Sequence, residues 1–348
     1  MKIENREIGR HQPPYIIAEL SANHNGSLET ACKVVDEAAK AGADAVKLQT
    51  YTADTITIKS DKKEFQIKGG LWHGRTLYDL YEQAYTPWEW HAVLFAHAKK
   101  RGITIFSSPF DPTAADFLDE LGAPAFKIAS FEAIDLPLIR YVAGKRKPMI
   151  ISTGMANLEE IEEAVQAARE GGCEELALLH CVSGYPAPPE DYKLATIADM
   201  ERRFGVPIGL SDHTLNNVSA VAAVALGATV IEKHFTLDRN GGGPDDSFSL
   251  EPSDLEQLCR DARIAWEAIG SVDYGLKSSE RSNAVFRRSL YAVQDIVKGS
   301  VITEEHVRSI RPGYGLAPKH LNQVIGSIAR EDIPRASAMR WELIKTKS

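Results

Sequence analysis

Residues 15–48, YIIAELSANHNGSLETACKVVDEAAKAGADAVKL, contain one strand–helix–strand unit, and this unit decides the fold. Residues 15–19 and 45–48 are short apolar runs typical of buried strands, and residues 28–41 repeat apolar side chains at helical spacing. Gly42 follows the helix where a left-handed cap is favoured. A helix between two buried strands predicts a parallel strand pair joined by a crossover connection.

The same alternation continues along the next two hundred or so residues. Strands are expected at residues 15–19, 45–48, 104–106, 125–128, 149–151, 176–180, 207–210 and 229–233. Helices are expected at residues 28–41, 88–101, 113–121, 136–143, 158–170, 195–204, 215–226 and 252–269. This repetition predicts an α/β protein built on a (β/α)8 TIM barrel. A doubly wound open sheet is the alternative, but no G-x-G-x-x-G follows the first strand.

The character of the chain changes after residue 273. Residues 274–284 are polar and are interpreted as a linker, and residues 285–348 combine short alternating runs with a Lys298-Gly299 turn. The expected organisation is therefore a catalytic barrel at 1–273, a linker at 274–284 and a small mostly-β domain at 285–348.

Composition excludes several classes of function. The 40 lysines and arginines are outnumbered by 48 acidic residues, and no basic block stands out, so nucleic acid is not an expected partner. The longest nearly apolar run, residues 220–231, is too short to span a bilayer, and no signal peptide is visible. No membrane partner is therefore expected. The four cysteines form no C-x-x-C pair, which favours a reducing cytoplasm.

The segment between the second expected strand and its helix is unusually long. It covers residues 50–87, whereas such loops usually have about 2–6 residues. It contains Trp72, Tyr78, Tyr81 and Tyr85. It is either a peripheral insertion packed on the barrel wall or a lid over the site, because such loops open on the catalytic face of a barrel.

Polar residues follow every expected strand, where a barrel places its chemistry. The strands that end near His213 and His234 are neighbours in a barrel, so the two imidazoles could share a divalent metal and leave positions open. Lys47 and Lys127, with nearby serine hydroxyls, suit a phosphate and a carboxylate. The residues thus indicate an enzyme acting on a small anion with metal assistance.

Several segments together resemble the sialic acid synthase family. They are residues 18–26 (AELSANHNG), 42–50 (GADAVKLQT), 127–130 (KIAS), 152–155 (STGM), 180–181 (HC), 209–213 (GLSDH) and 232–235 (EKHF). Residues 311–313 (RPG) resemble part of the antifreeze-like (SAF, β-clip) domain that closes the chains of this family. Residues 77–81, 85–90 and 244–249, with Ser21-Ala22, resemble the branch whose sugar carries two acetamido groups and lacks a 6-hydroxyl.

The resemblance implies a reaction in which phosphoenolpyruvate condenses with an open-chain N-acetylated amino sugar. The enol carbon attacks the sugar aldehyde, water attacks C2 of phosphoenolpyruvate, and the resulting tetrahedral intermediate loses phosphate. A divalent metal is implied as cofactor, Mn²⁺ in the first place and Mg²⁺ or Co²⁺ as alternatives, on His213 and His234. A carboxylate must take the proton of the water, and Glu19 and Glu132 are the candidates.

The remaining site residues are carried over from the family position by position. The implied phosphoenolpyruvate-binding residues are Lys47, Ser108, Lys127, Ser130, Ser152, Ser183 and Ser211, and Ser183 stands where neuraminate synthases usually have Asn. The implied sugar-binding residues are Gln49, Glu132, Tyr185, Asp245 and Arg311. Arg311 resembles an arginine that reaches the partner's barrel, which implies a domain-swapped homodimer.

Two other classes of function remain open at this point. One is a different phosphoenolpyruvate-using barrel enzyme, such as a 3-deoxy-ulosonate phosphate synthase or an aldolase, and an aldolase would need a Schiff-base lysine. The other is a binding protein without catalytic activity. Substitution of either histidine without loss of function would support it.

Overall fold

A closed barrel of eight parallel strands forms the first part of the computed structural model, which describes residues 1–346. Around the barrel the strands run in the order β10-β3-β4-β5-β6-β7-β8-β9. Their bounds are β3 Tyr15–Glu19, β4 Ala45–Thr50, β5 Thr104–Pro109, β6 Phe126–Ile128, β7 Met149–Ser152, β8 Leu176–Cys181, β9 Ile208–Ser211 and β10 Val230–His234. The predicted (β/α)8 barrel is confirmed, and the open sheet is excluded.

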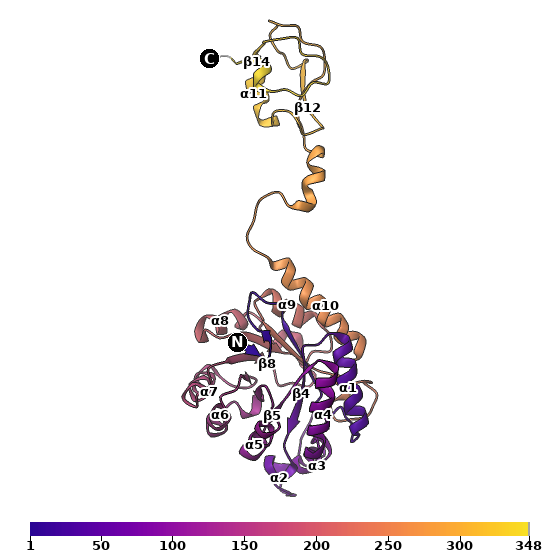
Figure 1. The fold of residues 1–348 in the computed structure, drawn as a ribbon, viewed down its shortest axis with the longest axis vertical. Helices are drawn as coiled ribbons and strands as arrows, with labels where there is room; N and C mark the ends of the chain where they lie inside the picture. Colours follow the sequence, from indigo (N-terminus) through magenta and orange to yellow (C-terminus); the bar gives the residue numbers. More distant parts are fainter. Residues whose placement is uncertain (347–348) are drawn as a thin grey trace. The chain divides into compact units, whose positions relative to one another are not determined.

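Helices surround the barrel on its outside (Figure 1). They are α1 Leu28–Ala41, α4 Trp88–Arg101, α5 Pro112–Glu120, α6 Leu136–Ala143, α7 Leu158–Glu170, α8 Thr196–Phe204, α9 Val218–Ala225 and α10 Pro252–Ile269. Side-chain caps define where several helices begin. Ser27 accepts a hydrogen bond from the Thr30 amide at α1, and Asn157 and Glu160 form a capping box at α7.

The hydrophobic core has two parts, as expected for a barrel. Apolar residues of the strands and the inner faces of the helices pack together in the larger part. The smaller part lies among inward-facing strand residues such as Ile17, Phe106 and Ile150, and Ile3 and Ile8 join it. Ile3 belongs to a hairpin of β1 (Lys2–Ile3) and β2 (Arg6–Glu7) that the sequence did not predict. Packing therefore fills one end of the barrel and leaves polar residues at the other.

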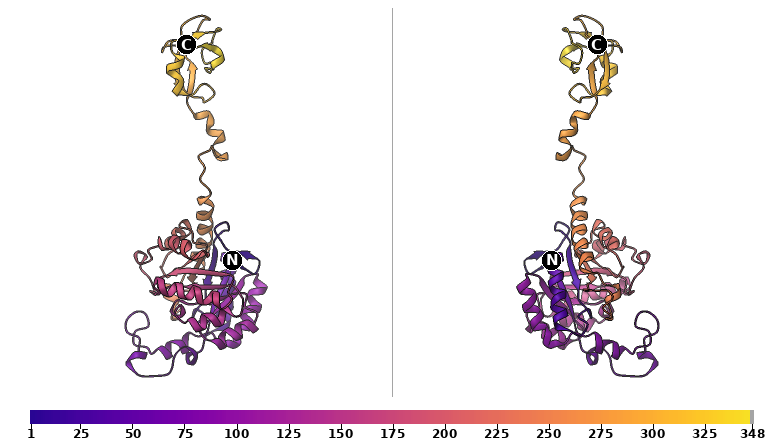
Figure 2. Two further views of the ribbon diagram at one scale, coloured as in Figure 1. Left: turned by 90° about the vertical axis from the view of Figure 1, so that its left-hand side faces the viewer. Right: turned by 90° about the vertical axis from the view of Figure 1, so that its right-hand side faces the viewer.

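The long connection between β4 and α4 carries two helices, α2 (Ala53–Ile56) and α3 (Leu77–Ala84). Figure 2 shows that part of this insertion extends beyond the ring of helices. A bridge pairs Gln66 with Thr76, and the indole Nε1 of Trp72 donates to the Pro244 carbonyl at 3.0 Å. The insertion thereby reaches the loop that follows β10, at the carboxyl ends of the strands.

The chain divides into two compact units, Met1–Gly270 and Ser271–Ser348. In the second unit η5 (Ser278–Phe286) is a 3-10 helix that overlaps the polar stretch 274–284 predicted as a linker and continues two residues beyond it. It is followed by β11 Ser289–Ala292, β12 Val307–Ile310, α11 Leu321–Val324, β13 Ile328–Ala329 and β14 Ile344–Lys345 around a small apolar core. The predicted boundaries at 273 and 284 stay a prediction. Within residues 1–346 no helix is long and apolar enough to cross a membrane.

Candidate active site

Four ionisable side chains meet inside the barrel near the carboxyl ends of its strands. Glu19 ends β3, Lys47 lies opposite it on β4, Lys127 lies on β6, and Glu232 lies on β10. All four are at most 5% exposed. Lys47 Nζ lies 2.6 Å from Glu19 Oε2 and 3.7 Å from Glu232 Oε1, which is itself 3.4 Å from Lys127 Nζ. We call these four residues the charged cluster.

Burial and mutual contacts shift the pKa values in this charged cluster. Burial raises the pKa of Glu19 to about 7, and Lys47 offsets only part of that rise. Burial also acts to raise the pKa of Glu232, but Lys127 and Lys47 outweigh it and lower that pKa below its usual value. Two lysines therefore face Glu232, whose ionised form is favoured, and Glu19, whose protonated form is favoured. This arrangement suits a bound anion.

Hydroxyl groups extend the site on one side of the charged cluster. Ser108 Oγ lies 3.3 Å from Lys47 Nζ, and Ser211 Oγ lies 3.5 Å from Glu232 Oε1. Of the other predicted serines, the buried hydroxyls of Ser152 and Ser183 have no hydrogen-bond partner among the described residues. Buried hydroxyls without partners are costly unless a ligand satisfies them.

Gly154 allows the hydroxyls of Ser130 and Ser183 to lie close to the backbone that follows β7. Its backbone N–H donates to Ser130 Oγ at 3.1 Å. A Cβ at this position would lie 2.3 Å from Ser183 Oγ and 2.7 Å from Ser130 Oγ, so any larger residue would displace both hydroxyls. The structure thus brings the residues predicted to bind phosphoenolpyruvate to one rim, and their role stays a prediction.

The two histidines predicted to hold a metal face each other across neighbouring strands β9 and β10. Their ring centroids are 5.4 Å apart. His213 Nδ1 contacts the Val182 carbonyl at 2.8 Å, which favours an Nδ1–H and a free lone pair on Nε2. The buried Nδ1 of His234 has no hydrogen-bond partner among the described residues, although Asp245 Oδ2 lies 3.8 Å away.

This donor set fits a divalent ion that keeps open positions. Burial holds the pKa of His234 well below its usual value, so that its imidazole is neutral and able to ligate. Residues 1–346 contain no group of three or more His, Cys, Asp or Glu side chains arranged to hold a metal ion. Two histidines would therefore need water or substrate oxygens to complete the coordination.

A cavity of about 290 Å³ lies beside the histidines and holds the predicted sugar-binding residues of the barrel. Gln49, Glu132, Tyr185 and Asp245 line it, together with His234. Its other wall is apolar and includes Ile56, Trp72, Leu80, Tyr81 and Phe110. The insertion supplies most of that wall, so the predicted lid forms part of the site.

Gln49 connects this cavity to the charged cluster. Its side-chain amide donates to Glu19 Oε1 at 2.9 Å and to Ser21 Oγ at 3.0 Å, and Ser21 in turn donates to Asp245 Oδ2 at 2.6 Å. A sugar in the cavity and an anion at the charged cluster would therefore lie next to each other, with Glu19 between them.

Two residues complete the account of the site residues: Arg311, which the sequence predicted, and Glu232, which it did not. Arg311 belongs to the second unit, where it is exposed and its guanidinium carbon lies 5.9 Å from the Phe286 ring centroid. Glu232 contacts both lysines, yet the sequence reasoning gave it no role. The signal was available, because Glu232 and His234 are two residues apart on one strand and so share a face.

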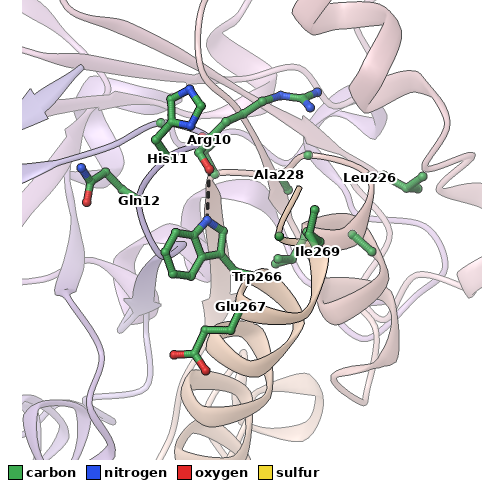
Figure 3. Close-up of a pocket in the computed structure, with 14 residues that line it drawn as sticks. Arg10, His11, Gln12, Leu226, Ala228, Trp266, Glu267 and Ile269 are labelled. Carbon is green, nitrogen blue, oxygen red and sulfur yellow. Dashed lines mark hydrogen bonds between the residues drawn. The ribbon is translucent and has the colours of Figure 1, made fainter. Parts of the chain in front are cut away.

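Another cavity, of about 600 Å³, lies near the amino ends of β3 and β10 (Figure 3). It is lined by Arg10, His11, Trp266 and neighbouring residues, and Trp266 Nε1 donates to the Arg10 carbonyl at 3.0 Å. It contains none of the predicted site residues, and chemistry in a barrel is found at the opposite end of the strands.

Glu132 gives a pH test that needs no substrate. Burial raises the pKa of its carboxyl to about 7 from an ordinary value of 4.5, so the fold favours the protonated form. Its stabilising contribution is complete below pH 4.5 and is lost as the pH rises through 7. The loss corresponds to on the order of 3 kcal/mol at most.

We expect Glu132→Gln, which stays neutral, to lose less unfolding free energy than the wild type between pH 4.5 and 8. Urea unfolding followed by tryptophan fluorescence across this range measures the difference, with Glu64→Gln on the exposed surface as the matched control. Identical pH dependence in wild type and Glu132→Gln would show that this carboxyl is not held protonated.

The fold and this site define a class of protein, a (β/α)8-barrel enzyme with a buried charged cluster at the carboxyl ends of its strands. Residues 34–274 match the NeuB family and residues 287–345 match the SAF domain. The chain belongs to the NeuB family, and the predicted membership in the sialic acid synthase family is confirmed.

Three similar proteins illustrate the relationship. A pseudaminic acid synthase of Campylobacter jejuni is 46% identical over 94% of this chain and 95% of its own length. An N,N'-diacetyllegionaminic acid synthase of the same species is 39% identical over 93% of this chain and 98% of its own. The crystal structure of an N-acetylneuraminic acid synthetase from Leptospira borgpetersenii superimposes with a TM-score of 0.73, at 32% identity, over 81% of this chain and 94% of its own.

Proposed function

We propose that this enzyme condenses phosphoenolpyruvate with 2,4-diacetamido-2,4,6-trideoxy-altrose, giving pseudaminic acid and phosphate. The observation that carries the proposal is that Gln49 joins the charged cluster to a cavity with one apolar wall. The lysines of the charged cluster suit the phosphate and carboxylate of phosphoenolpyruvate, and the apolar wall suits a sugar with a methyl group at C6. The similarity to pseudaminic acid synthases supports this choice of sugar.

In the proposed mechanism each group of residues has one task. Lys47 and Lys127 bind the anion, and its charge favours the protonated form of Lys127, whose pKa burial lowers. The hydroxyls of Ser130, Ser152 and Ser183 orient the phosphate. Glu19 takes the proton of the water that attacks C2, and the C2–O bond to phosphate then breaks. A divalent ion on His213 and His234, proposed to be Mn²⁺, would polarise the aldehyde oxygen of the sugar.

The proposal extends to assembly and location. Arg311 reaches the sugar in the partner's barrel of a domain-swapped homodimer, and mixing Arg311→Ala with Glu19→Gln chains would test this by restored activity. A cytoplasmic location is supported by the free thiols of all four cysteines, which suit a reducing compartment.

Phosphate release by the purified, Mn²⁺-loaded protein tests the substrate. Phosphoenolpyruvate is supplied with the altrose sugar, with N-acetylmannosamine or with the bacillosamine-derived manno isomer. Release with the altrose sugar alone is expected. Release with one of the others alone would make the protein a neuraminate or legionaminate synthase, and no release with any sugar would overturn the proposal.

Trp72 is expected to contribute to the choice of sugar. Its ring lies 5.6 Å from that of Tyr185, and it lines the cavity from the insertion. Removing it exposes the apolar side of the sugar to water, so we expect Trp72→Ala to lower kcat/KM for the altrose sugar by about 10–100-fold. The less apolar N-acetylmannosamine would lose less. Unchanged selectivity between the two sugars would refute this role.

A further inference from the structure

Lys233 is a buried cation that the proposed mechanism does not use. It lies on β10 between Glu232 and His234, and its side chain points away from theirs because successive residues of a strand alternate in direction. Only 2% of it is exposed. A buried lysine requires acceptors for all three of its N–H groups.

The ammonium group finds these acceptors on one short turn, residues 212–216, between β9 and α9. Lys233 Nζ lies 2.9 Å from Asp212 Oδ2, 2.8 Å from the Thr214 carbonyl and 2.9 Å from the Asn216 carbonyl. Asp212 Oδ1 also accepts from the Thr214 amide at 2.9 Å. One side chain of β10 therefore fixes the turn that follows the neighbouring strand β9.

His213 lies within that turn, and His234 is the residue that follows Lys233. The His213 amide donates to Tyr192 Oη at 2.6 Å, and its ring is held by the Val182 carbonyl. These contacts orient His213 but do not link it to β10. The backbone bond from the Asp212 amide to the Glu232 carbonyl and the Lys233 contacts provide that link.

We propose that Lys233 is a positioning residue for the metal site, because it fixes the turn carrying His213 against the strand carrying His234. The inference rests on the proposed metal-dependent function. Without the ammonium group, the Thr214 and Asn216 carbonyls lose a buried donor and the turn shifts relative to β10. The spacing of the two imidazoles then changes, while the charged cluster, on the opposite face of β10, keeps its contacts.

Stability and positioning must be separated, since Lys233 and Asp212 form a buried ion pair. Removing one partner leaves the other as an unpaired buried charge and destabilises the fold, whereas neutralising both partners lowers the free energy of unfolding much less. The double variant Lys233→Met/Asp212→Asn removes both charges and keeps an acceptor for the Thr214 amide. The double variant is the protein to be tested, and it remains usable if Lys233→Met alone does not fold.

The experiment is a titration of metal-free full-length protein with Mn²⁺, in which electron paramagnetic resonance measures the free ion. Wild type and Lys145→Met are expected to bind equally, since Lys145 lies in the turn after α6 and forms its ion pair with Asp116 of α5, outside the barrel. The double variant is expected to bind Mn²⁺ about 10–100-fold more weakly, with kcat lowered and KM for phosphoenolpyruvate unchanged. Circular dichroism and urea unfolding verify its fold.

Each outcome has a defined meaning. A folded double variant with wild-type Mn²⁺ affinity would overturn the positioning role and leave the proposed function intact. If the wild type is active and His213→Ala binds Mn²⁺ as tightly as the wild type, the metal site itself is overturned, and the positioning role with it. An equal loss of affinity in Lys145→Met would show that any buried or partly buried lysine has this effect, which also contradicts the proposal.

Discussion

Glu19→Gln is expected to lower kcat by about 10²–10⁴-fold, the usual contribution of a positioned general base. Glutamine retains the shape of the side chain and can still contact Lys47, but it cannot accept a proton from water. Because Gln49 holds one oxygen of Glu19 and Lys47 lies 2.6 Å from the other, the carboxylate has a fixed orientation between the two substrate regions. Few substitutions should cost as much activity with so little change in structure.

The pH profile distinguishes this role from simple binding. Burial raises the pKa of Glu19 to about 7, and a base must be ionised to act, so wild-type kcat/KM is expected to fall as the pH decreases through 7. Steady-state phosphate release from pH 5.5 to 9 measures this. The residual activity of Glu19→Gln should lack the acidic limb, and Glu64→Gln on the exposed surface should retain it. An acidic limb of unchanged position in Glu19→Gln would assign the base to another residue.

His213→Ala and His234→Ala are each expected to abolish tight Mn²⁺ binding and to lower kcat by at least about 10³-fold. The estimate follows from the several kcal/mol that Lewis-acid polarisation of a carbonyl contributes. Each imidazole is half of the protein's donor set, since residues 1–346 contain no larger group of ligands around it. Neither variant should therefore be rescued by the remaining histidine.

The matched control is His11→Ala, because His11 is exposed and lines the cavity near the amino ends of the strands. Mn²⁺ titration and phosphate release are measured for all three variants. Full activity of His213→Ala or His234→Ala in the presence of a chelator would show that the reaction needs no metal at this place.

The sequence was sufficient to predict the barrel because its strands are nearly continuous apolar runs separated by amphipathic helices. β3 has the predicted bounds, Tyr15–Glu19, whereas β5 extends to Pro109, three residues beyond its predicted end. The extra residues include two serines, which are not typical of a buried strand. Ser108 Oγ faces the site beside Lys47, whereas Ser107 Oγ contacts Thr50 on the outer side of the barrel. Strand ends are thus hardest to predict where the chemistry lies.

Contacts between distant segments could not be predicted from local patterns. The link from Gln49 to Glu19 depends on the register of β3 and β4, and the contact of Trp72 with Pro244 and the position of Glu232 between two lysines depend on barrel closure. Residue type placed these groups near the strand ends, but only the register of neighbouring strands determines which of them touch. The same holds for Lys233, whose partners lie on the preceding strand's turn.

The central claim is that water attacks C2 of phosphoenolpyruvate at the charged cluster and that the C2–O bond breaks only when a sugar has been joined. Phosphoenolpyruvate labelled with ¹⁸O in the bridging oxygen tests it directly, by mass spectrometry of the released phosphate. With the altrose sugar present, we predict that the phosphate carries the label and that none is released without sugar. Unlabelled phosphate, or release in the absence of sugar, would mean that the protein cleaves the P–O bond as a phosphatase and would contradict the account.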